Sequence, residues 1–113
     1  MAWDALAIPF APGAQAHQIL DPFVYLGLLA GQTERIALGV ASIILPLRHP
    51  AHVAKAAMSA DRLSSGRVLL GVASGDRPEE YPALGMTFPD RGARFRDSVD
   101  YIRALAGDRP RVE

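Results

Sequence analysis

Ala73-Ser74-Gly75-Asp76 is the stretch whose residue types are best suited to holding a ligand. It follows a short apolar run, Val68 to Val72, that is typical of a buried strand. Small residues at a strand end let the backbone approach a phosphate, and the Ser74 hydroxyl could meet a phosphate or a sugar hydroxyl. The glycine spacing is not that of a dinucleotide site, and no Gly-Lys-Ser/Thr follows as in a P-loop. Spacing alone does not decide whether this stretch is the wall of a ligand site or an ordinary turn.

A second stretch, Gly39-Val40-Ala41-Ser42, places small residues inside an apolar run. Ala41 and Ser42 could leave room for a flat ligand. Tight packing of the strand against a helix explains the same residues, and the pattern alone favours packing.

The three histidines do not indicate a catalytic base or a metal site. His49 precedes Pro50 at a helix start, which is typical of a capping or surface residue. His17 and His52 have no evident partner, and no two histidines lie at metal-ligand spacing with a carboxylate. We therefore predict no metal and identify no catalytic residue. We expect the acidic cluster in the following loop to be solvated: Asp76, Glu79 and Glu80.

Composition narrows the class of protein. The 113 residues are 50% hydrophobic, and 12 basic residues balance 12 acidic ones, so net charge gives no argument for nucleic acid or an anionic membrane. With no cysteine, disulfides and thiolate chemistry are excluded. The start of the chain has no basic n-region, and the apolar stretch 36–47 is too short to span a bilayer. We expect a soluble cytoplasmic protein.

The elements that must position these residues alternate between strand and helix. Apolar periodicity and Pro/Gly punctuation predict strands at 3–8, 35–44 and 67–72, and helices at 22–30, 50–63 and 90–106. Short loops between them favour a parallel α/β arrangement, βαβαβα. We predict a loop at 73–89, Asp90 as the N-cap of the last helix and Gly107 as its C-cap. Phe95, Val99, Ile102 and Ala106 should form its inward stripe.

Two features suggest that more than these elements is needed. The helix from Pro22 to Ala30 is apolar all round, so we expect it to be buried on more than one side. Three parallel strands also leave open edges. The chain is therefore either a piece of something larger or part of an assembly.

An ordered series of motifs over about residues 20–106 resembles the luciferase-like monooxygenase family, the flavin-dependent group that includes bacterial luciferase. The motifs are Leu38-Gly39-Val40, Leu45-Pro46-Leu47-Arg48-His49-Pro50, Asp61-Arg62-Leu63-Ser64-Ser65-Gly66-Arg67 and Leu70-Gly71-Val72-Ala73-Ser74-Gly75. The resemblance implies a (β/α)₈ TIM barrel, of which residues 1–113 would form one partial domain.

The resemblance also assigns positions. Ala41-Ser42 matches a non-proline cis peptide whose bulge backs the flavin, and Ala73, Ser74 and Gly75 match a turn that lines the flavin. Bacterial luciferase has a cysteine and an arginine at the positions of Ala73 and Ser74, so light emission is not implied. The segment 7–10 lacks the charged residues or histidine that many members carry there.

The implied activity is that of a flavin-dependent monooxygenase, in which reduced FMN and O₂ oxidise a small organic substrate. A dehydrogenase that uses a deazaflavin coenzyme is one alternative. A non-catalytic barrel fragment that acts as a dimerising scaffold is the other. By the same resemblance, a homodimer would form through the helices near 22–30 and 50–63, which would explain the apolar surface of the first.

Overall fold

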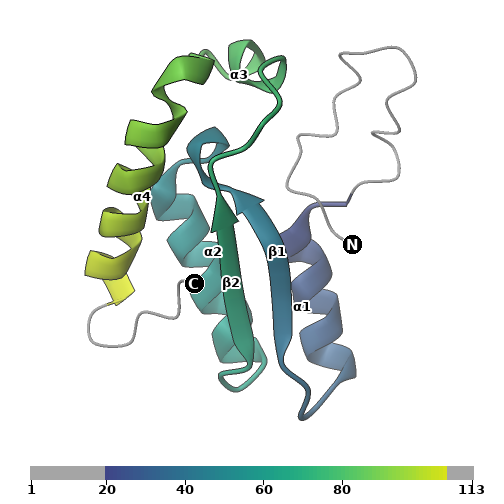
Figure 1. Cartoon of the computed structure of the whole chain (residues 1–113). Helices are drawn as coiled ribbons and strands as arrows, with labels where there is room; N and C mark the ends of the chain where they lie inside the picture. Colours follow the sequence, from purple (N-terminus) through teal and green to yellow (C-terminus); the bar gives the residue numbers. More distant parts are fainter. Residues whose placement is uncertain (1–19, 107–113) are drawn as a thin grey trace.

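The computed structural model describes residues 20–106, in which two parallel strands lie against three long helices (Figure 1). The predicted strand at 3–8, His17 and Gly107 lie outside this range. The helices are α1 (Pro22–Gln32), α2 (Pro50–Leu63), α3 (Glu80–Ala83) and α4 (Arg91–Ala106), and the strands are β1 (Leu38–Ile44) and β2 (Val68–Ala73). Two short 3₁₀ turns, η2 (Leu45–Leu47) and η3 (Phe88–Asp90), precede α2 and α4.

The two strands are joined by α2 in a parallel βαβ unit, which confirms the predicted α/β class. Leu38 pairs with Val68 at the start of the ladder, and Ile44 pairs with Ala73 at its end. The register shifts between Val40 and Ile43, where β1 carries one extra residue relative to β2. The strand ends therefore meet at one edge of the sheet.

The predicted boundaries are close to the observed ones, with physical reasons for the differences. The helix predicted at 50–63 is confirmed in full. The strand predicted from residue 35 begins at Leu38, because residues 34–36 form a bend in which Ile36 is 60% exposed. The helix predicted to stop before Gly31 continues to Gln32. The predicted loop 73–89 contains α3 and η3.

Both predicted N-caps before a proline are present. An Asp21 Oδ1 atom accepts hydrogen bonds from the backbone N–H groups of Phe23 and Val24, at 2.9 and 3.1 Å. His49 Nδ1 accepts from the Ala51 N–H at 3.1 Å, so His49 caps α2 as expected. Pro at the first helical position supports both starts, since its missing N–H needs no partner there.

The last helix, α4, begins at Arg91, directly after Asp90, as the sequence predicted. Asp90 is the last residue of the 3₁₀ turn η3, and its carboxylate accepts a hydrogen bond from the Thr87 hydroxyl. The Asp90 N–H donates to the Thr87 carbonyl at 3.3 Å. Asp90 thus ends a 3₁₀ turn that leads directly into α4.

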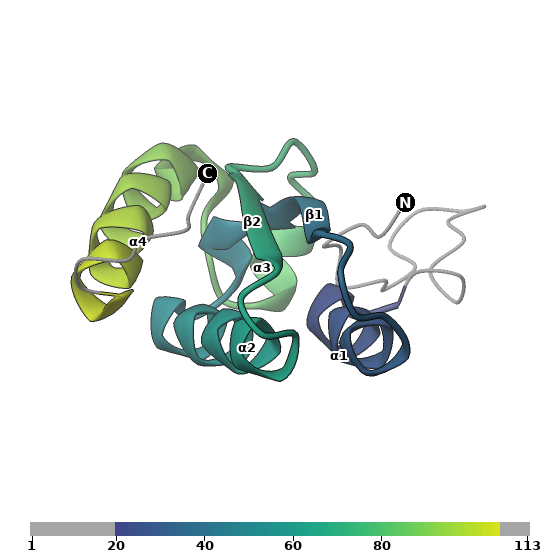
Figure 2. The same cartoon turned by 90° about the horizontal axis from the view of Figure 1, so that it is seen from below.

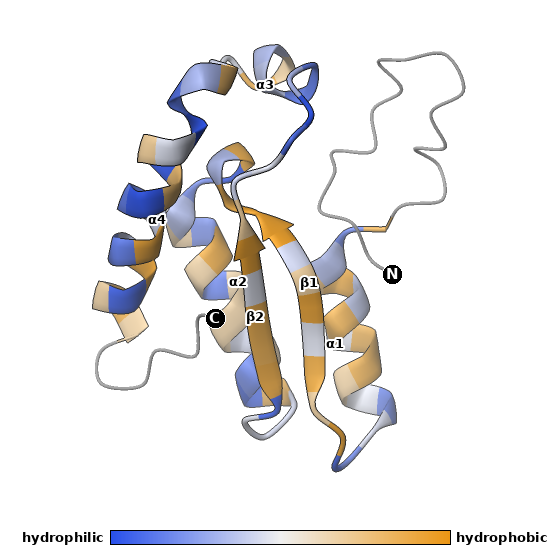
Figure 3. Cartoon of the chain, viewed as in Figure 1, coloured by the Kyte–Doolittle hydropathy of each residue, from blue (hydrophilic) through white to orange (hydrophobic). Residues whose placement is uncertain are grey.

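Helices α1 and α2 pack side by side against one face of the sheet, and α4 packs beside α2 (Figure 2). The core lies between these layers and includes Leu26, Val40, Val53, Leu70 and Ile102. Burial of such aliphatic side chains is the main stabilising contribution, at about 1.5–3 kcal/mol for each. The hydropathy colouring shows apolar strands and a polar outer side of α4 (Figure 3).

The opposite face of the sheet is open in the described chain. Gly39 and Ala41 are exposed, and Leu69 is 50% exposed. Near-continuous apolar runs such as these are typical of strands that are buried on both faces in parallel sheets. Only the helix-covered face is buried within residues 20–106, because two strands cannot close on themselves.

The first helix was predicted to be buried on more than one side, but only one of its sides is buried within residues 20–106. Leu26 and Ala30 of α1 are buried, whereas Val24 and Leu28 are 74% and 55% exposed. In α4, Ile102 is buried, and Phe95 and Val99 pack against the core, which confirms most of the predicted stripe. No helix within residues 20–106 is long and apolar enough to cross a membrane.

Candidate functional site

The five residues predicted for a cofactor lie at the carboxyl ends of two adjacent strands. Ala41 and Ser42 stand where the register of β1 shifts, and the peptide bond between them is cis, as the family resemblance implied. Ala73 ends β2, and Ser74 and Gly75 follow it. Since β1 and β2 are paired neighbours, the two small-residue stretches lie on one sheet. Ala41 lies beside Gly71, and Ile44 pairs with Ala73. Carboxyl ends of parallel strands are where ligands bind in such sheets.

Small side chains make this edge shallow and accessible. Ala41 is exposed, while Ser42, Ala73, Ser74 and Gly75 are half-buried. Among residues 20–106, neither the Ser42 nor the Ser74 hydroxyl has a hydrogen-bond partner. This edge of the sheet therefore presents a surface of small side chains, against which a flat ring could lie, and two hydroxyls able to bind polar groups. These residues fit the ring system of a flavin, and their role as its site stays a prediction.

The turn after β2 has a conformation that favours glycine. Gly75 has a φ of +84°, in the left-handed region that L side chains rarely adopt. A Cβ atom placed on Gly75 would lie 2.6 Å from Ile44 Cγ2 and 2.9 Å from the Tyr81 hydroxyl. The turn is thus packed between the end of β1 and the side chain of Tyr81.

Tyr81 is a site-supporting residue that the sequence analysis did not single out. Its side chain is fully buried, and its hydroxyl donates a 2.6 Å hydrogen bond to the Ser74 carbonyl oxygen. Burial raises the pKa of Tyr81 above its usual value, so the hydroxyl remains a donor at neutral pH. The available signal was weak: an aromatic residue in an otherwise polar, Pro/Gly-rich loop.

The acidic cluster is only partly solvated, in contrast to the expectation. Asp76 and Glu79 are exposed, but Glu80 is buried. Glu80 Oε1 lies 3.8 Å from Arg77 Nη1. A buried carboxylate needs a counter-charge to offset desolvation, so Glu80 differs from the other two because α3 turns it inward beside Arg77.

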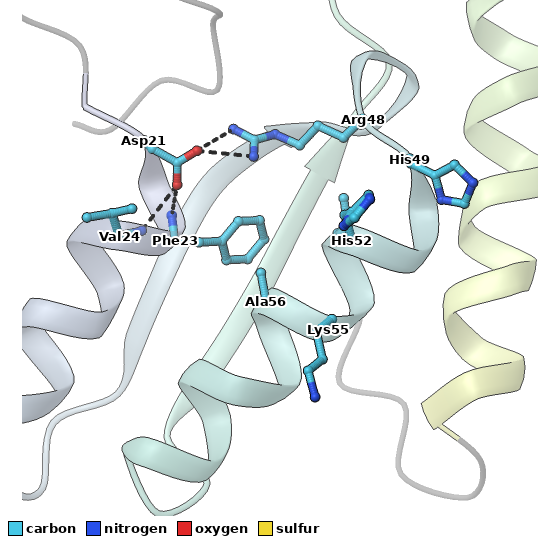
Figure 4. A pocket seen from close by; sticks show the side chains of 9 residues that line it. Asp21, Phe23, Val24, Arg48, His49, His52, Lys55 and Ala56 are labelled. Atoms are coloured by element: carbon cyan, nitrogen blue, oxygen red, sulfur yellow. Dashed lines mark hydrogen bonds and ion pairs between the residues drawn. The ribbon is translucent and has the colours of Figure 1, made fainter.

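A separate groove of about 580 Å³ lies in the helix layer, between the first turns of α1 and α2 (Figure 4). Asp21 Oδ2 lies 3.2 Å from Arg48 Nη2 across it. The strands lie behind this groove, so it is distinct from the strand ends that hold the predicted site. The other lining residues are Phe23, Val24, His49, His52, Val53, Lys55 and Ala56.

The described histidines do not form a metal site. His49 and His52 face each other edge to face at 5.7 Å between ring centroids, and His49 is engaged as a helix cap. No group of three His, Cys, Asp or Glu side chains suited to a metal ion occurs within residues 20–106.

Two curated relatives illustrate the sequences that this chain is similar to. It is 39% identical over 93 residues to the 4-hydroxyprotoasukamycin monooxygenase of Streptomyces nodosus subsp. asukaensis, covering 81% of this chain and 25% of the relative. It is 44% identical over 94 residues to an F420-dependent glucose-6-phosphate dehydrogenase of Beutenbergia cavernae, covering 79% of this chain and 28% of the relative. The chain thus spans about a quarter of the length of these oxidoreductases.

Solved structures agree on the fold. A monooxygenase from Streptomyces bottropensis matches with a TM-score of 0.72 and 28% identity over 75% of this chain and 26% of its own. The oxygenating constituent of 3,6-diketocamphane monooxygenase from Pseudomonas putida, solved in complex with FMN, matches with a TM-score of 0.75 over 88% of this chain and 28% of its own. At 22% identity, the latter shows the fold alone.

The resemblance seen in the ordered motifs is confirmed by the family comparison. The model of a family described as luciferase-like monooxygenase matches residues 5–113. The chain therefore belongs to the luciferase-like monooxygenase family and represents part of its barrel fold.

Proposed function

We propose that this chain carries part of the cofactor site of a flavin-dependent monooxygenase that oxidises a small organic substrate. One observation supports this most directly. The two small-residue stretches lie on paired neighbouring strands, Ala41-Ser42 in the second half of β1 and Ala73-Ser74-Gly75 at the end of β2, and Ala41 is exposed. Such an edge can hold a flat ring with little steric hindrance.

Each part of the site has a separate task in this proposal. Ala41 and Ser42 would back the ring from β1, and the turn from Ala73 to Gly75 would line it from β2. The Ser74 hydroxyl, which has no partner among residues 20–106, would donate to a polar atom of the cofactor. When bound, reduced FMN supplies the electrons with which O₂ is activated, and the protein orients it and excludes water.

A deazaflavin-dependent dehydrogenase is a second candidate, and a specific observation favours it. The relative at 44% identity is named as F420-dependent. Deazaflavin has the same flat ring shape as FMN, so the same surface suits both. The two candidates differ in whether O₂ takes part in the reaction.

The proposed partners are a small-molecule substrate and a second copy of the chain. A homodimer through α1 and α2 would cover the apolar side chains that α1 exposes, among them Val24 and Leu28. The zero net charge supports neither a nucleic-acid nor a membrane partner, and the lack of cysteine suits the cytoplasm.

The test is a titration of the 113-residue chain with FMN and, separately, with F420, followed by fluorescence quenching of the cofactor. We expect saturable binding in about the micromolar range. Ala41→Leu should weaken cofactor binding at least tenfold, because a larger side chain would occupy the surface against which the ring lies. Ala93→Leu, at an exposed position on α4, is the matched control and should leave binding unchanged.

The outcome separates the candidates. Binding of FMN in preference to F420 supports the monooxygenase, and the reverse preference supports the dehydrogenase. If neither cofactor quenches up to about millimolar concentration, this chain holds no flavin, and the dimerising scaffold becomes the better description.

A further inference from the structure

The Tyr81 side chain links the short helix α3 to the turn that follows β2. Its hydroxyl donates to the Ser74 carbonyl oxygen at 2.6 Å, seven residues back along the chain. The side chain is fully buried. A hydrogen bond in such surroundings is strong and costly to lose, because water cannot replace the missing donor.

The same hydroxyl also packs closely beside the next residue of the turn. A Cβ on Gly75 would approach it to 2.9 Å, and Ile44 of β1 would meet that Cβ from another direction at 2.6 Å. The turn is therefore confined between Ile44 and Tyr81. This explains how a segment with a left-handed glycine can keep one conformation.

The ring of Tyr81 is itself held by Phe88, in the 3₁₀ turn η3 that precedes α4. It packs edge to face against Phe88, with 5.2 Å between centroids and an interplanar angle of 84°. The Arg91 guanidinium lies 3.8 Å from the Phe88 ring centroid. Arg91 Nη1 also donates to the Phe88 carbonyl at 3.2 Å. A continuous set of contacts thus runs from Arg91 through Phe88 and Tyr81 to Ser74.

We propose that Tyr81 is a positioning residue, whose hydroxyl holds the Ser74-Gly75 turn in the conformation that lines the cofactor. This inference rests on the proposed function, because the turn matters for chemistry only where a flavin lies against it. Tyr81 does not itself touch the ring in this proposal. It acts through the backbone of Ser74.

The test uses Tyr81→Phe, which removes the hydroxyl and keeps the ring against Phe88. Tyr101→Phe, at an exposed tyrosine on α4, is the matched control. Backbone ¹⁵N relaxation of the cofactor-free chain reports the turn directly. We expect the order parameters of Ser74, Gly75 and Asp76 to fall from about 0.85 towards 0.6 in Tyr81→Phe. Those of α2 should not change, which shows that the fold is intact.

Cofactor titration provides the second readout. The Kd of whichever cofactor binds the unmodified chain should rise about three- to tenfold in Tyr81→Phe, as expected for one lost hydrogen bond. The visible absorption bands of the bound cofactor should also shift, since the wall beside its ring has changed. Tyr101→Phe should alter neither quantity.

The two readouts separate this inference from the proposed function. Unchanged order parameters in Tyr81→Phe would overturn the positioning role, even if the unmodified chain binds a flavin. A mobile turn with unchanged cofactor Kd would overturn it as well. The turn could become mobile in Tyr81→Phe while the unmodified chain binds neither cofactor. That result would support the positioning of Ser74 by Tyr81 and would contradict the proposed function.

Discussion

The Arg67 guanidinium holds Thr33 at two points, although the two residues are 34 positions apart. Arg67 Nη1 donates to the Thr33 hydroxyl at 2.8 Å, and Nη2 donates to the Thr33 carbonyl at 2.9 Å. Further hydrogen bonds from the same group reach the carbonyls of Ala30, Ile36 and Ser64. The carbonyls at the end of a helix have no intrahelical partner and carry partial negative charge. Arg67 therefore joins the end of α1 to the start of β2.

Removing this group should destabilise the fold. Arg67→Ala should lower the free energy of unfolding by about 2–4 kcal/mol, because several part-buried carbonyls lose a charged donor together. Arg67→Lys should recover less than half of the loss, since an ammonium cannot reproduce the planar fork. Chemical denaturation with circular dichroism measures both values.

Arg62→Ala is the control for the Arg67 variants, because Arg62 is exposed near the end of α2. It should change stability by less than about 0.5 kcal/mol. Equal losses for Arg62→Ala and Arg67→Ala would show that the bonds to α1 contribute little.

Two glycines on paired strands should respond differently to the same substitution. A Cβ on Gly71 would overlap the Val40 carbonyl oxygen, a backbone atom that cannot move aside easily. A Cβ on Gly39 would lie 3.3 Å from the Leu69 carbonyl oxygen. Gly71→Ala should therefore cost about 1–3 kcal/mol, and Gly39→Ala less than about 1 kcal/mol. Thermal unfolding of both variants tests the order, and a larger loss in Gly39→Ala would contradict the strand packing.

Asp21 has two roles that substitution can separate. One carboxylate oxygen caps α1, and the other accepts from Arg48 at 3.2 Å. Asp21→Asn keeps a cap and should cost less than about 1 kcal/mol, because an exposed ion pair contributes little. Asp21→Ala loses both interactions and should cost about 1–2 kcal/mol. Raised salt should reduce the difference in free energy of unfolding between wild type and Asp21→Asn. A difference that persists at high salt would argue against an ionic contribution.

The buried hydroxyl of Tyr81 predicts a loss of stability at alkaline pH. Burial raises the folded-state pKa of Tyr81 above its usual value of about 10; the nearby Glu80 carboxylate acts in the same direction, and Arg91 opposes the shift. The unfolded chain therefore releases this proton first. The stabilisation is complete below about pH 10 and is lost as the pH rises through the folded-state pKa. Unfolding free energies measured across this range should fall less in Tyr81→Phe than in wild type, and parallel curves would contradict the shift.

The exposed apolar side of α1 predicts self-association. Leu28 is 55% exposed on α1, and Met58 is 52% exposed on α2. If a second copy covers these helices, Leu28→Lys should shift the light-scattering mass from dimer towards monomer. Leu105→Lys changes an equally apolar side chain on α4, 50% exposed, and should leave the mass unchanged. A monomeric wild-type chain would contradict the proposed dimer.

Local sequence signals were sufficient for most of the elements. Asp21-Pro22 and His49-Pro50 start helices because caps and prolines act within a few residues. Alternating strand and helix patterns indicated a parallel α/β chain for the same reason. The start of α4 was placed within one residue, whereas the 3₁₀ turn η3 in front of it was not predicted.

The candidate site was predictable as two separate stretches, and their relative placement depended on the path of the chain. The pairing of β1 with β2 places Ala41 beside Gly71, and Ile44 beside Ala73 and Gly75, which no local pattern specifies. The contacts of Tyr81 with Ser74 and of Arg67 with Thr33 depend in the same way on how α3 and α1 pack. Short-range propensities and caps thus determine the elements, whereas register and packing decide which side chains meet, because those energies arise only between segments distant in sequence.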